Sequence, residues 1–178
     1  ARVGRGTDGG LHLTEDLFAS GRATHVGTVD FSDYPPAARQ VPRVGGHDGL
    51  DLERIRALGP DLILAWSGGN PSRQLAQIEA LGIAVFHDGT HRLGQLPAVL
   101  ERLGVLTGRT AAANAVAESY RRRLAVLESR FARKRPVRVF FQVWEQPLMT
   151  VSREQVISDA LRVCGAVNVF ASLPALVP

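Results

Sequence analysis

The sequence predicts an α/β fold with two Rossmann-like parallel-sheet lobes joined by one long α-helix, the second lobe being incomplete. Three observations support this prediction. Short apolar strands alternate with helices of apolar periodicity up to about residue 108. Residues 109–134 contain no glycine or proline and are rich in alanine, arginine, leucine and glutamate, which predicts a helix of roughly 40 Å. Only one strand–helix unit and a fragment follow that helix.

The first lobe is expected to alternate strands and helices with short connections. Its predicted elements are a helix over 15–20, strands over 25–30, 61–66 and 83–87, and helices over 52–58, 71–81 and 96–108. Asp51 is expected to cap the helix that ends at Gly59. Asn70 is expected to cap the next helix, with Pro71 at its first position. The continuous apolar run 62–66 is typical of a parallel strand that is buried on both faces.

The second lobe is expected to begin with a strand over 137–144 and a helix that ends near Cys164. The predicted domain organisation is therefore an N-terminal lobe over 1–108, a connecting helix over 109–135 and the start of a C-terminal lobe over 136–178.

The composition is that of an ordinary globular protein, with 45% hydrophobic residues and a net charge of +4. No apolar run approaches the ~20 residues of a membrane span, and the first residues lack the apolar segment of a signal peptide. The single Cys164 permits no internal disulfide. Arginines cluster over 121–123 and 130–138, but without stacking aromatics or a reader motif, so we expect a solvated helix face and no nucleic-acid partner.

The two tryptophans of the chain, Trp66 and Trp144, each end a predicted strand. Ligands of α/β proteins gather at the carboxyl ends of parallel strands, so these side chains indicate a site for a large, flat ligand. Gly68 and Gly69 keep the surroundings of Trp66 open and expose backbone N–H groups. The alternative is that both tryptophans are core side chains, and for Trp144 the two interpretations are equally supported.

Other site types have weaker support. Gly4, Gly6 and Gly9 form a G-x-G-x-x-G pattern with Asp30 downstream, as in a nicotinamide-dependent enzyme, but no strand is predicted before Gly4. The five histidines are expected on the surface or in loops: His12, His25, His47, His87 and His91. No catalytic constellation can be assembled, so we expect a protein that is not an enzyme and that uses no catalytic cofactor.

Several segments resemble one family, the vitamin B12-binding periplasmic proteins of ABC importers, which are substrate-binding proteins with a helical backbone (class III). The resemblance runs from about Leu13 to the end and is carried by these segments: 31–36 (FSDYPP), 52–55 (LERI), 60–66 (PDLILAW), 138–142 (RVFFQ) and 164–170 (CGAVNVF). It implies two α/β lobes, one long helix, and cobalamin as the transported ligand.

The resemblance also implies ligand contacts, a partner and a location. With Trp144 added from its place after a predicted strand, the expected ligand-binding residues are Phe31, Trp66, Gly68, Gly69, Asn70, Trp144 and Phe170. Ser72 stands where the family has an acidic residue that docks on the permease. We expect a monomer that is periplasmic or anchored to the membrane outside the cytoplasm and that serves an inner-membrane ABC permease.

Two points are left open by the resemblance. The same fold also serves haem and ferric siderophores, which remain alternative ligands. In addition, the family opens on a buried strand, whereas residues 1–10 hold four glycines and one branched apolar residue, so no strand is expected there.

Overall fold

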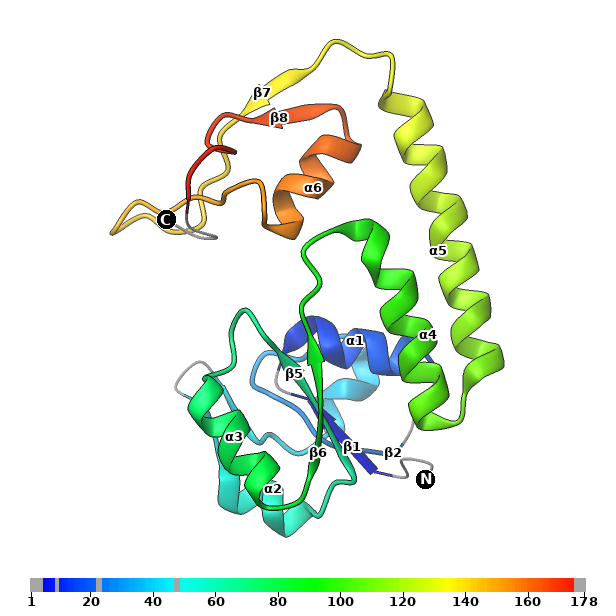
Figure 1. The fold of residues 1–178 in the computed structure, drawn as a ribbon, viewed down its shortest axis with the longest axis vertical. Helices are drawn as coiled ribbons and strands as arrows, with labels where there is room; N and C mark the ends of the chain where they lie inside the picture. Colours follow the sequence, from blue (N-terminus) through cyan, green and yellow to red (C-terminus); the bar gives the residue numbers. More distant parts are fainter. Residues whose placement is uncertain (1–4, 9, 22–23, 47–48, 175–178) are drawn as a thin grey trace. The chain divides into compact units, whose positions relative to one another are not determined.

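The computed structural model describes residues 5–8, 10–21, 24–46 and 49–174. The chain divides into two compact units (Figure 1). Unit 1 comprises residues 1–89 and 99–116, and unit 2 comprises residues 90–98 and 117–178. The predicted boundaries after residues 108 and 135 fall near the ends of helices, whereas the compact units divide inside two helices.

Unit 1 alternates strands and helices. Its elements are β1 (Arg5–Asp8), α1 (Leu11–Ala19), β2 (Thr24–Gly27), the 3-10 helix η1 (Pro36–Gln40), β3 (Gly45–Gly46), β4 (Gly49–Leu50), α2 (Leu52–Leu58), β5 (Leu62–Trp66), α3 (Ser72–Ala80), β6 (Ala84–Asp88), most of α4 (Leu96–Thr107) and the beginning of α5 (Thr110–Phe131). The four long strands form one parallel sheet in the order β2-β1-β5-β6, and β3 pairs with β4 in a small antiparallel ladder.

The expectation that residues 1–10 contain no strand is wrong, because β1 is a central strand of this sheet. Gly6 pairs with His25 of β2 on one side and with Leu62 of β5 on the other. Two neighbouring strands thus supply the hydrogen bonds that an isolated glycine-rich segment cannot make. Gly6 lies inside the strand and not in a turn after it, which removes the basis of the nicotinamide interpretation; Gly4 and Gly9, like His47, lie outside the described residues.

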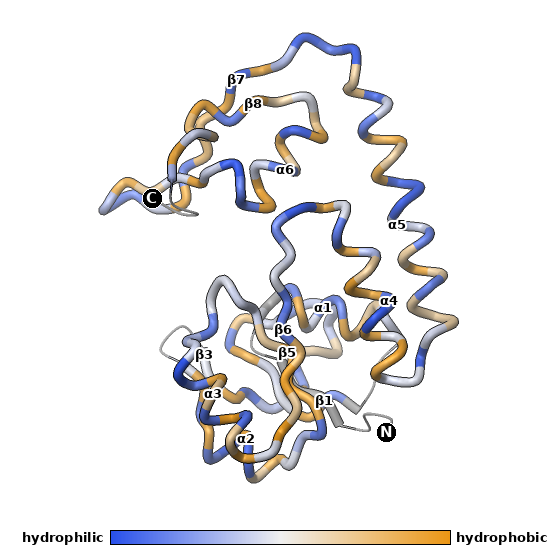
Figure 2. The backbone as a smooth tube through the Cα atoms, viewed as in Figure 1, coloured by the Kyte–Doolittle hydropathy of each residue, from blue (hydrophilic) through white to orange (hydrophobic). Residues whose placement is uncertain are grey.

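The sheet is covered on both faces, and β5 contributes alternate residues to each face. Figure 2 shows the hydrophobic character of this strand. On one face, Ile63 and Ala65 pack against α2 and α3, and that cluster also includes Val29, Val44, Leu50, Ile55, Leu75 and Ile78. On the other face, Leu62 and Leu64 pack against α1 and α4, together with Leu13, Leu17, Val99 and Leu103. This confirms the prediction of an α/β fold in which the strand over 62–66 is buried on both faces.

Two helix caps show how local sequence sets the elements around β5. The Asp51 prediction is confirmed, since its side chain accepts a hydrogen bond from the Arg54 N–H at 2.9 Å and α2 ends at Gly59, whose φ is 53°. The Asn70 prediction is wrong, because the N-cap of α3 is Pro71. The Asn70 side chain instead accepts a hydrogen bond from the backbone N–H of Trp66 at 2.7 Å.

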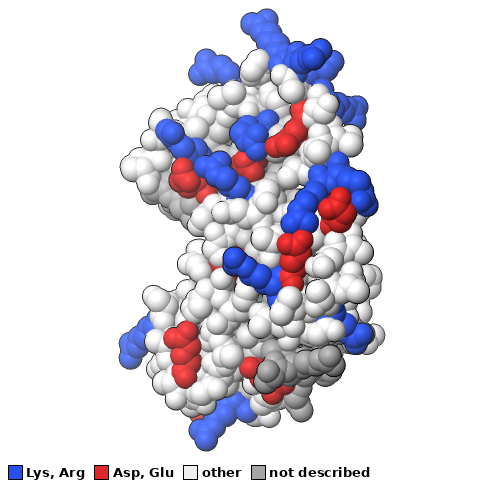
Figure 3. Space-filling model, turned by 45° about the vertical axis from the view of Figure 1, so that its right-hand side comes forward, with Lys and Arg blue, Asp and Glu red and all other residues white. Residues whose placement is uncertain are grey.

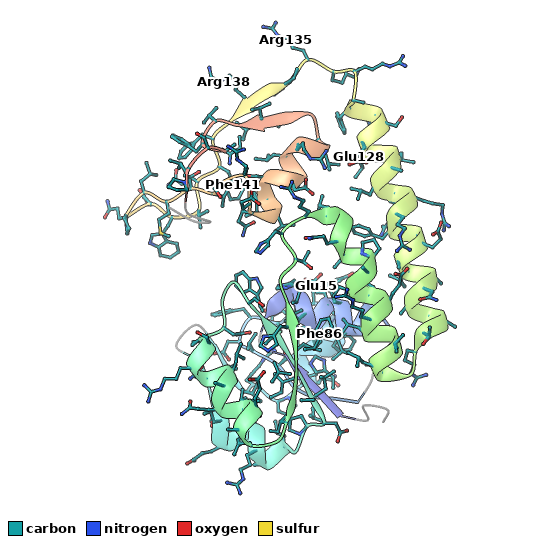
Figure 4. The ribbon with its side chains drawn as sticks, viewed as in Figure 1. Glu15, Phe86, Glu128, Arg135, Arg138 and Phe141 are labelled. Carbon is teal, nitrogen blue, oxygen red and sulfur yellow. The ribbon has the colours of Figure 1, made fainter. Side chains whose placement is uncertain are left out.

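Helix α5 contains most of the predicted long helix and contributes to both units. Glu118 pairs with Arg121 at 4.0 Å and with Arg122 at 3.4 Å along its exposed surface. Figure 3 shows basic and acidic side chains mixed on this face of the molecule, and Figure 4 shows Arg135 and Arg138 pointing outward after the helix. In the part of the chain that is described, no helix, α5 included, combines the length and the apolar character that crossing a membrane requires.

Unit 2 also contains a strand–helix–strand arrangement. Its elements are the 3-10 helix η2 (Leu93–Gln95), the remainder of α5, β7 (Val137–Val139), α6 (Val156–Val163) and β8 (Ala166–Asn168). The parallel strands β7 and β8 pair over three residues. The predicted strand over 137–144 is therefore too long. The chain leaves the ladder after Val139 and turns back where the Val143 N–H bonds the Met149 carbonyl at 2.9 Å, so that Trp144 does not end a strand.

Residues 90–98 belong to unit 2 because Asp159 of α6 holds them there. Its buried carboxylate accepts hydrogen bonds from the Leu93 N–H at 2.8 Å and from Arg162 Nε at 2.9 Å. Arg92 lies 3.9 Å from the same carboxylate. The hydrogen bond to Asp159 raises the pKa of the Arg162 guanidinium above its usual value. One aspartate thus joins two segments that are 66 residues apart.

Replacing Asp159 with alanine is expected to lower the free energy of unfolding by about 2 to 3 kcal/mol, because it leaves the Leu93 N–H without its charged acceptor. Hydrogen exchange should accelerate at the amides of residues 90–98. Glu154→Ala is the matched control, since Glu154 pairs with Arg92 at 3.7 Å on the exposed surface. Equal exchange rates in the two variants would contradict this role for Asp159.

Candidate functional site

The sheet of unit 1 has a topological switch point between β1 and β5, where the chain changes the side of the sheet to which it adds strands. The chain passes from β1 through α1 to β2 on one side, then crosses to β5 and β6 on the other. In open α/β sheets, ligands bind beyond the carboxyl ends of the two strands at such a switch point. Gly10 and His12 lie shortly after β1 in the chain, and β5 ends at Trp66, so these residues lie at the edge where binding is expected.

A tight turn after β5 determines the surroundings of Trp66. The N–H groups of Gly69 and Asn70 donate to the Trp66 carbonyl at 3.1 and 2.9 Å, while the Asn70 side chain accepts from the Trp66 N–H. Ser67 N–H donates to the carbonyl of Asp88 on β6 at 2.9 Å, which joins the turn to the neighbouring strand. The turn is therefore closed by its own backbone and by one amide side chain.

The indole of Trp66 lies against the two glycines of this turn. A Cβ atom at Gly68 would lie 2.9 Å from the indole Nε1, and one at Gly69 would overlap the ring atoms Cε3 and Cζ3. Gly10, which precedes α1, also lies close to Trp66, because a Cβ added there would be 3.3 Å from the Trp66 Cβ. Three glycines thus leave room for one half-buried aromatic ring.

Replacing Gly69 with alanine is expected to displace the indole and to lower the free energy of unfolding by about 1 to 3 kcal/mol, which is the usual cost of overpacking. Near-UV circular dichroism reports the change in the tryptophan environment. Gly89→Ala serves as the control, because an added Cβ there meets no atom within 4 Å. An unchanged tryptophan band in Gly69→Ala would show that the ring does not rest on the turn.

Phe31 follows β2, at the same edge of the parallel sheet. It is 77% exposed and has a left-handed backbone with a φ of 65°, which costs a non-glycine residue about 1 kcal/mol or more. Arg43 supports this turn by donating hydrogen bonds to the Val29 carbonyl at 3.0 Å and to the Ser32 carbonyl at 3.1 Å. The fold therefore holds a large aromatic side chain in solvent at the expected ligand edge.

Buried hydroxyl groups connect the Phe31 turn to α1. Thr14 Oγ1 lies 2.8 Å from Thr28 Oγ1 and donates to Ser32 Oγ at 3.0 Å. All three side chains are buried. The turn that carries Phe31 is thus linked to the helix that begins at the switch point.

Three ionisable residues lie close to one another at this edge. His12 Nε2 is 3.1 Å from Asp88 Oδ2, and the imidazole makes an edge contact with Trp66, with centroids 5.7 Å apart and an interplanar angle of 87°. Asp16 is buried one turn further along α1, and within the described residues its Oδ2 has no hydrogen-bond partner. The pKa of Asp16 is raised to about 7, mainly because burial disfavours the charged carboxylate; nearby His12 lowers this pKa, and the negative charges of Asp88 and Glu15 contribute to raising it.

The expectation of surface or loop histidines is wrong for His25, which is buried on β2 and packs against Phe18 with ring centroids 5.4 Å apart. The expectation is confirmed for His12, which is 44% exposed at the start of α1, although its imidazole also contacts a buried carboxylate. Among the described residues, no group of three or more potential ligands is arranged to hold a metal ion.

The remaining predicted residues lie in unit 2 or on α3. Trp144 is 62% exposed in the loop before Met149, and residues 142–146 line a hollow of about 460 Å³. Phe170 packs edge-on against Phe140, with centroids 5.4 Å apart. Ser72 is exposed at the first position of α3, where it directly follows the Trp66 turn.

The structure thus brings Trp66, Gly68, Gly69 and Asn70 together in one turn and places Phe31 at the same sheet edge. Sequence reasoning missed His12, Asp88 and Arg43 as supports of these residues. A signal for His12 was present, since it follows the glycines after β1, but it could be interpreted only once β1 was recognised as a strand.

Comparison with known proteins agrees with this architecture. A family model described as "Periplasmic binding protein" matches residues 11–175. A vitamin B12-binding protein of Yersinia pestis (strain Pestoides F) is 39% identical over 159 residues, which cover 89% of this chain and 57% of the relative. The chain therefore spans just over half the length of this curated relative.

Solved structures show the same similarity. The periplasmic vitamin B12-binding protein BtuF of Vibrio cholerae superposes with a TM-score of 0.93 at 33% identity, covering 99% of this chain and 69% of that one. The periplasmic haem-binding protein BhuT, solved in complex with two haems, gives a TM-score of 0.82 at 25% identity over 94% of this chain and 67% of its own. These matches confirm the resemblance drawn from the sequence, and the chain belongs to the periplasmic binding protein family.

Proposed function

We propose that this chain is part of a substrate-binding protein that captures cobalamin or a related corrinoid and delivers it to an ABC importer. The observation that carries the proposal is the Trp66 turn at the switch point of unit 1, with the exposed Phe31 at the same edge. A corrin ring has broad apolar faces and a fringe of amides, so it requires aromatic walls and a few hydrogen-bonding groups. The similarity to vitamin B12-binding proteins supports the same ligand.

The proposed ligand contacts come from both units. They are Phe31, Trp66, Gly68, Gly69 and Asn70 of unit 1, and Trp144 and Phe170 of unit 2. Ser72 is the proposed docking position for the permease, and the uncharged serine weakens that contact because it lacks the negative charge of the family's acidic residue. We infer a non-enzymatic monomer without a catalytic cofactor or nucleic-acid partner, located in the periplasm or anchored outside the cytoplasm.

Haem is the second candidate ligand, because the haem-binding BhuT shares the fold at 25% identity. Calorimetric titration of the chain with cyanocobalamin and with haemin distinguishes the two. We expect saturable binding of cyanocobalamin that is stronger than any binding of haemin. Binding of haemin alone, or of neither compound, contradicts the proposal for this chain.

A further inference from the structure

The glycines around Trp66 permit its orientation but do not fix it. Gly68 and Gly69 leave space for the indole on one side, and Trp66 packs only partly against the cluster that contains Leu13 and Leu64. A half-buried ring can still change rotamer. An aromatic wall contributes most to binding when it is already oriented before the ligand arrives, because the ligand then does not bear the cost of ordering it. A further contact that restricts the ring therefore adds to its preorganisation.

His12 makes that contact. Its imidazole lies edge-on to the indole at 5.7 Å and 87°, which is the favoured perpendicular geometry for aromatic pairs. His12 itself is 44% exposed, so packing alone does not hold it in place.

Asp88 anchors the imidazole. The His12 Nε2–H donates to Asp88 Oδ2 at 3.1 Å, and the Asp88 side chain is only 3% exposed. Asp88 is the sheet partner of Trp66 in the register of β5 and β6. A buried carboxylate beside Trp66 in the sheet thus holds a histidine that arrives from the start of α1, so three chain segments meet at the indole.

We propose that His12, oriented by Asp88, is a positioning residue that fixes the Trp66 indole as a preformed wall for the ligand. The expected effect of His12 on ligand binding rests on the proposed corrinoid function. Its consequence for Trp66 itself does not depend on any ligand.

The fluorescence of Trp66 tests the positioning directly. The chain has two tryptophans, so in a Trp144→Phe background all tryptophan emission comes from Trp66. In that background, His12→Ala should lower the steady-state anisotropy of Trp66, shift its emission to longer wavelength and increase its quenching by acrylamide. His12→Phe keeps an aromatic edge without the donor, and His12→Gln keeps a donor without the ring, so both should give intermediate values.

The same variants test the effect on binding. His12→Ala should weaken cyanocobalamin binding about threefold to tenfold relative to the Trp144→Phe parent, the range that one lost aromatic contact implies. His87→Ala is the matched control. His87 lies on the same strand as Asp88, pairs with Glu79 at 3.1 Å and is exposed, so its removal should change neither readout.

Unchanged Trp66 emission, anisotropy and quenching in folded His12→Ala would overturn the inference, as would an equal response in His87→Ala. Circular dichroism establishes that each variant is folded. If the unsubstituted chain fails to bind cyanocobalamin, the proposed function fails, while the fluorescence measured without ligand still decides whether His12 positions Trp66.

Discussion

Replacing Trp66 with alanine is expected to weaken cyanocobalamin binding about 30-fold, which corresponds to about 2 kcal/mol for a central aromatic contact. The reason is geometric, since Trp66 ends β5 at the switch point and its side chain is only half-buried. Part of the ring also packs against the cluster that contains Leu13 and Leu64. The same variant should therefore lose about 1 to 2 kcal/mol of folding free energy.

Isothermal titration measures the change in affinity, and urea denaturation measures the change in stability. Phe86 provides the matched control, because it packs against the same cluster from β6. Phe86→Ala should cost a similar folding free energy with little effect on affinity. Equal losses of affinity in the two variants would show that Trp66 acts through the core and not through the ligand.

Asp16 is expected to make the stability of the protein depend on pH. Its folded-state pKa of about 7 lies well above its usual value of 3.8, so ionisation opposes folding. Below about pH 4 the carboxyl is protonated in both states and carries no penalty. Between pH 4 and 7 the unfolded chain releases this proton and the folded chain retains it, so the free energy of unfolding falls as the pH rises, by about 4 kcal/mol in all.

Asp16→Asn should abolish this dependence. The variant should match the parent near pH 4 and exceed its free energy of unfolding by up to about 4 kcal/mol at pH 8. Urea denaturation at pH 5, 6, 7 and 8 measures the difference. Glu53→Gln serves as the control, because Glu53 is an exposed acid in the first turn of α2. Its free energy of unfolding should change with pH in the same way as that of the parent. The same pH dependence of the free energy of unfolding in Asp16→Asn and in the parent would contradict the prediction.

The sequence was most informative where local signals and tertiary packing agree. The apolar run over 62–66 became β5, the Asp51 cap became the start of α2, and the stretch without glycine or proline became α5. Each of these signals acts within a few residues of the chain, through side-chain capping, helix propensity or burial on both faces of a strand. The Trp66 turn was found for the same reason, since it directly follows an identifiable strand.

The sequence was misleading where long-range partners decide the structure. Strand β1 is held by β2 and β5 and not by its own glycine-rich residues. The apolar run after Val137 ends as a strand when its pairing with β8 ends. Asn70 has a side chain that is typical of a helix cap, but that side chain accepts a hydrogen bond from the Trp66 N–H and does not cap α3. The link from His12 to Asp88 spans 76 residues, and no local pattern predicts such a contact.

The anchoring of residues 90–98 by Asp159 has a consequence for any attempt to dissect this protein. The polypeptide passes between the units three times, after residues 89, 98 and 116, so neither unit is a continuous stretch of chain. A fragment that ends within α5 contains residues 90–98 but lacks Asp159, which accepts their hydrogen bond. A fragment that starts within α5 contains Asp159 but lacks residues 90–98. No single cut of the chain yields two fragments that each contain a whole unit. Two fragments made by a cut within α5 should associate when mixed, through residues 90–98 and Asp159.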